Sequence, residues 1–83
     1  MAKPTRTDYL AFAKASSDDH QVRITNVTTQ DTLFEDRLDQ VELNTIYMMT
    51  VSRNDYTRSW GYLILINENG EIENALNRFL EEA

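Results

Sequence analysis

A single histidine beside two aspartates is the arrangement in this sequence that most suggests catalytic or metal-binding chemistry. His20 directly follows Asp18 and Asp19. A carboxylate can orient an imidazole for proton transfer, or the imidazole can ligate a divalent cation. A lone histidine next to aspartates in a loop is far more often a surface residue without a chemical role. We therefore expect no catalytic residue, no metal site and no cofactor.

Motifs for nucleophilic or phosphate chemistry are missing from the sequence. The chain has no cysteine, and its two glycines, Gly61 and Gly70, cannot build a phosphate-binding loop or a dinucleotide-binding turn. A chain of 83 residues also offers little concave surface for an active site. The sequence thus favours a non-enzymatic protein.

Acidic side chains dominate the charge of the chain. With 14 Asp and Glu against 8 Lys and Arg, the formal net charge is -6, which disfavours direct binding to nucleic acid. Carboxylates spaced along a strand or helix can instead imitate successive phosphates and occupy a basic groove of a target protein. The candidate residues for this acidic face are Asp31, Glu35, Asp36, Asp39 and Glu42 in one group, and Glu68, Glu71 and Glu73 in another.

This profile is similar to that of small acidic inhibitors encoded by phages and mobile elements, including inhibitors of uracil glycosylase and of restriction. The likeness lies in length, charge and lack of cysteine, and no diagnostic motif assigns a family. It implies a DNA mimic that binds a nucleic-acid-binding protein. The alternative is that the acids only keep a small domain in solution.

The apolar pattern predicts a single α+β domain over residues 1–83, with an N-terminal helix, an antiparallel meander of about four strands and a C-terminal helix. The first helix should begin at an N-cap of Thr5 or Thr7 and end near Ser16. The C-terminal helix is expected over residues 71–83, after a turn. Its apolar stripe consists of Ile72, Leu76, Phe79 and Leu80.

Three strands are predicted from β-branched and aromatic residues, at 20–27, 46–53 and 60–66. The segment 32–41 stays open between two structures. It could pair with the first strand as a hairpin, or form a short amphipathic helix, because Thr32 and Glu35 have the spacing of a capping box.

The strands at 46–53 and 60–66 carry apolar side chains on both faces. Three arrangements explain this pattern: helices on opposite faces, a second copy on one face, or a different protein docked there. A patch rich in Tyr, Met and Trp is typical of such docking. The candidate docking or dimer residues on the apolar sheet face are Tyr47, Met49, Val51, Trp60 and Tyr62.

The sequence shows no run of membrane-spanning length and no apolar signal segment near its start. We expect a cytoplasmic protein without membrane contact. Its expected partner is another protein, in particular a nucleic-acid-binding one, and the alternative is a homodimer that acts as a structural or adaptor protein.

Overall fold

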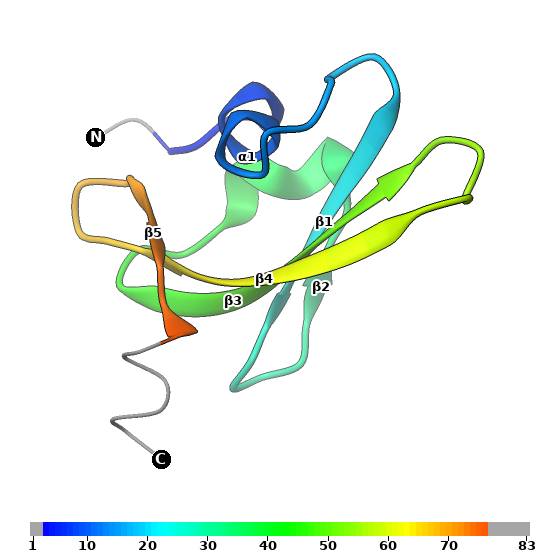
Figure 1. The fold of residues 1–83 in the computed structure, drawn as a ribbon. Helices are drawn as coiled ribbons and strands as arrows, with labels where there is room; N and C mark the ends of the chain where they lie inside the picture. Colours follow the sequence, from blue (N-terminus) through cyan, green and yellow to red (C-terminus); the bar gives the residue numbers. More distant parts are fainter. Residues whose placement is uncertain (1–2, 77–83) are drawn as a thin grey trace.

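The computed structural model describes residues 3–76, which form a five-stranded antiparallel sheet with two helical segments on one of its faces (Figure 1). In chain order the elements are α1 (Arg6–Phe12), β1 (His20–Asn26), β2 (Thr32–Leu33), the 3-10 helix η1 (Glu35–Gln40), β3 (Thr45–Arg53), β4 (Ser59–Ile66) and β5 (Ile72–Asn74). Within residues 3–76, no helix has the length and apolar character needed to cross a membrane.

Helix α1 begins at the predicted N-cap, Thr5. The side chain of Thr5 accepts a hydrogen bond from the backbone of Asp8, and the carboxylate of Asp8 accepts one from the backbone of Thr5. The helix ends at Phe12, earlier than the expected Ser16, because Lys14 adopts a φ of 56°. A residue in this left-handed conformation terminates an α-helix.

The sheet is antiparallel, as predicted, but its strand order is β2-β1-β3-β4-β5 in place of a simple meander, and it has five strands where about four were expected. In a meander β3 would pair with β2, but here it pairs with β1. The reason is length: β2 has 2 residues and pairs only with Ile24 and Thr25, whereas β1 pairs with β3 along all of its 7 residues.

The segment 32–41 combines both of the structures that its sequence allowed. Thr32 belongs to β2, where its hydroxyl lies 3.0 Å from that of Thr25. The next residues form η1, whose N-cap is Phe34 without a side-chain hydrogen bond. The capping box between Thr32 and Glu35 therefore does not form, because the Thr32 side chain is used by the sheet.

The predicted C-terminal helix is wrong at its beginning, where β5 pairs with the edge of β4. A tight turn returns the chain to the sheet: the side chain of Asn67 accepts hydrogen bonds from the backbone of Asn69 and Glu71, and Gly70 has a φ of 79°. Ile72 then pairs with Ile66. The rest of that helix prediction, including Phe79 and Leu80, lies outside the described residues.

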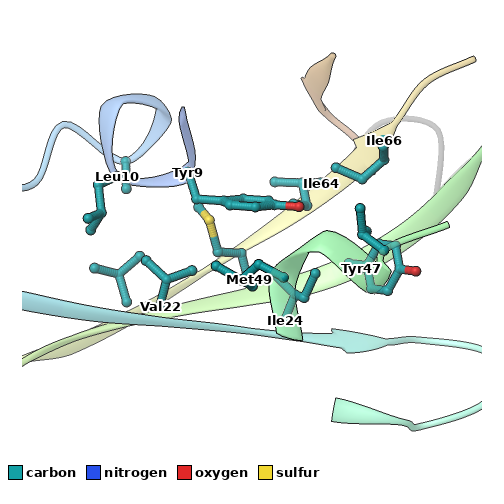
Figure 2. Close-up of a cluster of buried hydrophobic side chains, with 12 residues drawn as sticks. Tyr9, Leu10, Val22, Ile24, Tyr47, Met49, Ile64 and Ile66 are labelled. Atoms are coloured by element: carbon teal, nitrogen blue, oxygen red, sulfur yellow. The ribbon is translucent and has the colours of Figure 1, made fainter. Parts of the chain in front are cut away.

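The core lies between α1, η1 and one face of the sheet. In Figure 2, Tyr9 and Leu10 of α1 lie over side chains from three strands. Residues on alternate positions of each strand share a face, and both helical segments described within residues 3–76 cover the same one. The fully buried members on the covered face are Val22, Ile24, Met49, Val51, Ile64 and Ile66.

Candidate protein-binding surface

The predicted docking face is the covered face of the sheet. Tyr47, Met49 and Val51 are at most 2% exposed, because α1 and η1 pack over them. The expectation that these three side chains meet a partner is therefore wrong. Period-two alternation assigned them correctly to one face but could not show which face the helices cover.

Trp60 and Tyr62, the other two members of that set, lie at the border of the core and are partly buried. The ring of Phe12 contacts Tyr62 edge-on at 5.9 Å, and that of His20 contacts Trp60 edge-on at 5.4 Å. The guanidinium of Arg58 lies 6.0 Å from the Trp60 ring centre, within the range of a cation–π contact. Both rings are thus engaged by neighbours within the chain.

His20 is buried, at 8% exposure, and the expectation of a surface histidine is wrong. It is the first residue of β1 and shares the covered face with Val22. Its Nδ1 atom donates to the carbonyl oxygen of Ser16 at 2.8 Å, since a carbonyl can only accept. Among residues 3–76 no group of three or more His, Asp or Glu side chains could hold a metal ion. The structural role of His20 is to tie the loop before β1 to the sheet.

The opposite face of the sheet, called here the open face, carries no described helix. Its register places Met48 opposite Leu63 and Ile46 opposite Leu65, so these four side chains adjoin one another and form the apolar patch. Met48 is 40% exposed, Ile46 and Leu63 are partly buried, and Leu65 is 6% exposed. The sequence does not reveal this patch, because Met48 and Met49 are equally apolar and the pattern does not show which of the two is exposed.

Met48 extends the patch along the sheet. Its sulfur lies 3.3 Å from the position that a Cβ atom would take on Gly61. The absence of a side chain at Gly61 therefore lets Met48 lie flat against β4. Beyond Gly61, the open face changes from apolar to polar.

The polar half of the open face forms part of an open groove of about 700 Å³. Its floor includes the hydroxyl groups of Ser52 and Ser59, which are 3.1 Å apart. Two aromatic side chains also line it, Phe34 at 56% exposure and Tyr56 at 75%. The groove adjoins the apolar patch, so the open face offers both polar and apolar contacts.

Tyr56 occupies the turn between β3 and β4 with a φ of 60°, a conformation that is unusual for an aromatic residue. The same turn is held by Asp55, whose carboxylate accepts hydrogen bonds from the Thr57 hydroxyl and backbone at 2.7 and 3.1 Å. These hydrogen bonds lower the pKa of Asp55 below its ordinary value. The turn thus fixes an exposed Tyr56 at the rim of the groove.

The eight candidate acids differ in their surroundings. Glu35 is partly buried, forms an ion pair with Arg6 and accepts a hydrogen bond from the backbone of Val22, so its role is structural. The other seven are exposed, and within residues 3–76 none of them forms an ion pair.

The two acidic groups lie toward opposite edges of the sheet. The first group flanks β2 and η1, and the second lies in and before β5. Four strand spacings separate these edges, about 19 Å. Glu73 is opposite Leu65 in the register and borders the apolar patch. The structure therefore does not bring all eight acids into one cluster.

No protein-family model, curated protein or solved structure matches this chain.

Proposed function

We propose that this chain is a cytoplasmic, non-enzymatic protein-binding domain that acts through the open face of its sheet. The observation that carries the proposal is the position of α1 and η1 on the same face. It leaves Met48 40% exposed on the other face, at the end of the apolar patch that borders the polar half. Contiguous apolar surface of this kind, bordered by polar residues, is typical of protein docking sites.

The chemistry of the neighbouring groove supports binding over catalysis. Its described lining includes hydroxyl groups, the amide of Gln21 and the guanidinium of Arg23, along with the carboxylates of Glu35 and Asp36. Glu35 is already paired with Arg6. These groups suit hydrogen bonding to a partner, and the groove lining contains no histidine or cysteine to act as base or nucleophile.

The test compares two variants that add the same charge to different faces. Met48→Lys places a cation in the apolar patch, and Ala11→Lys places one on the exposed side of α1. We expect wild type and Ala11→Lys to retain the same partner after cross-linking in cells, and Met48→Lys to lose it. Equal capture by both variants would exclude the open face as the binding site.

A second candidate function is occupation of a basic groove by the acidic groups, as a DNA mimic would do. It is favoured by the seven exposed carboxylates that lack ion pairs within residues 3–76. Asp36→Asn, Asp39→Asn and Glu42→Gln combined should abolish such binding and leave the melting temperature nearly unchanged. Retained binding would remove this group from the interface.

A further inference from the structure

We infer that the apolar patch receives an amphipathic helix of a partner protein whose polar side carries Lys and Arg. This inference rests on the proposed function and names the kind of partner that fits the open face. It is argued from the dimensions of the patch, from the charges beside it and from the charge of the chain.

The dimensions of the patch match one helix. Met48 and Leu63 form one row across β3 and β4, and Ile46 and Leu65 form the next. Adjacent strands are about 4.8 Å apart and alternate residues along a strand about 7 Å. An α-helix with its side chains is about 10 Å wide, so one apolar helix face covers Met48, Leu63 and Ile46. Leu65 is 6% exposed and adds little accessible surface to the patch.

An exposed apolar residue also follows β5. The backbone N–H of Ala75 donates to the carbonyl of Leu63 at 2.9 Å. Leu76, the next residue, is 53% exposed. The chain therefore carries a further exposed apolar side chain close to the sheet edge formed by β5.

The negative charge at the β5 edge of the sheet favours a cationic side chain on the partner. The side-chain amide of Asn67 donates to the carboxylates of Glu73 and Glu71, at 2.7 and 3.4 Å, and holds both near one point. Within residues 3–76 neither carboxylate forms an ion pair. A Lys or Arg beside the apolar stripe of a bound helix would neutralise this pair and steer the association.

The same charges disfavour a second copy as the occupant. Each chain carries a formal net charge of -6. Two open faces in contact would also bring two copies of the Glu71 and Glu73 pair to one interface. Like charges across an interface oppose binding. A basic helix, in contrast, is attracted to each of these carboxylates.

The experiment titrates the full chain into a fluorescently labelled amphipathic helix made of Leu and Lys and measures anisotropy. Met48→Lys should weaken binding at least about tenfold, because it places a cation where the apolar stripe sits. Glu73→Gln should weaken it about threefold and reduce the salt dependence of the affinity.

Two variants serve as matched controls. Ala11→Lys adds the same charge as Met48→Lys on α1, and Asp18→Asn removes one exposed charge in the loop before β1. Both should bind the peptide as wild type does, and all four variants are compared by thermal unfolding. A Leu/Lys peptide of the same composition with no apolar face should not bind.

Several results would overturn the inference. Equal binding of both peptides, or equal loss in test and control variants, would mean charge attraction without a helix site. A dimer in sedimentation equilibrium that Met48→Lys dissociates would assign the face to a second copy, and the proposed function would stand. Peptide binding that appears only after Phe79→Asp would assign it to the chain's own C-terminal segment. If Met48→Lys changes neither peptide binding, self-association nor capture in cells, the proposed function fails as well.

Discussion

The side chains of Arg6 and Glu35 form hydrogen bonds with the outer backbone edge of β1, where a neighbouring strand would otherwise pair. The guanidinium of Arg6 donates to the carboxylate of Glu35 and to the carbonyl oxygens of Ser17 and His20. The same carboxylate accepts from the backbone N–H of Val22 at 3.3 Å. Because β2 is too short to reach this part of β1, the ion pair satisfies backbone groups that would otherwise form an open sheet edge.

Arg6→Ala should therefore lower the free energy of unfolding by about 1–3 kcal/mol, because it removes the donor to two carbonyl groups and the cation paired with a partly buried carboxylate. Urea unfolding measures the change. Arg37→Ala is the control, since among the described residues the Arg37 guanidinium bonds only to the exposed side chain of Gln40. A similar loss in both variants would contradict the role given to Arg6.

Substitution by phenylalanine should have opposite effects on stability at the two buried tyrosines, Tyr9 and Tyr47. Within residues 3–76 the hydroxyl of Tyr9 has no hydrogen-bond partner, whereas that of Tyr47 accepts from the backbone of Glu42 at 2.9 Å. Tyr9→Phe should leave stability unchanged or raise it by up to about 1 kcal/mol, and Tyr47→Phe should lower it by about 1 kcal/mol. Urea unfolding of both variants provides the comparison, and an equal loss would show that the Tyr9 hydroxyl is satisfied.

Alkaline pH should destabilise the fold through Tyr9. Burial is the main cause that raises the pKa of its hydroxyl above the ordinary 10.0, with smaller contributions from Tyr47 and Asp8. Above pH 10 the unfolded chain loses this proton and the folded chain keeps it, so the free energy of unfolding falls as pH rises. The stabilisation is complete below pH 10.

Unfolding measured between about pH 8 and pH 11 checks this expectation. Wild type should lose stability over this range, and Tyr9→Phe should lose less. Tyr56→Phe, at a position that is 75% exposed, is the control. An unchanged slope in Tyr9→Phe would exclude Tyr9 as the source. Burial also raises the pKa of Tyr47, so part of the slope should remain.

The turn between β3 and β4 should tolerate glycine better than tyrosine. Left-handed backbone costs a residue with a side chain about 1–2 kcal/mol, and the flexibility of glycine in the unfolded chain offsets part of the gain. Tyr56→Gly should thus raise the free energy of unfolding by up to about 1 kcal/mol. Thr28→Gly, at a position that does not have a positive φ, should lower it. Equal effects would mean that the conformation of Tyr56 carries no strain.

Local signals in the sequence predicted the elements that local interactions determine. Thr5 and Asp8 form a cap within one helical turn, and β1, β3 and β4 each lie within two residues of their predicted bounds. Alternation of apolar residues also grouped Tyr47 and Met49 on one face. These features depend on neighbours in the chain, so the sequence was sufficient.

Contacts between distant residues decided the features that were predicted wrongly. Ile72 fits the apolar stripe of a helix in the sequence. In the structure, the turn at Asn67 and Gly70 reverses the chain, so Ile72 pairs with β4 as part of β5. Met48 and Met49 are the same residue type, and only the position of α1 buries one and exposes the other. The proposed binding surface could not be found from the sequence because it lies on the sheet face opposite α1 and η1.

The position of β1 between β2 and β3 determines when the chain can fold during synthesis. The hairpin of β1 and β2 contains two residue pairs, too few to persist alone in water. Val22 and Ile24 therefore stay exposed on the nascent chain until their partners in β3, Val51 and Met49, leave the ribosome. A chain released before that point would present an unpaired apolar strand and should aggregate.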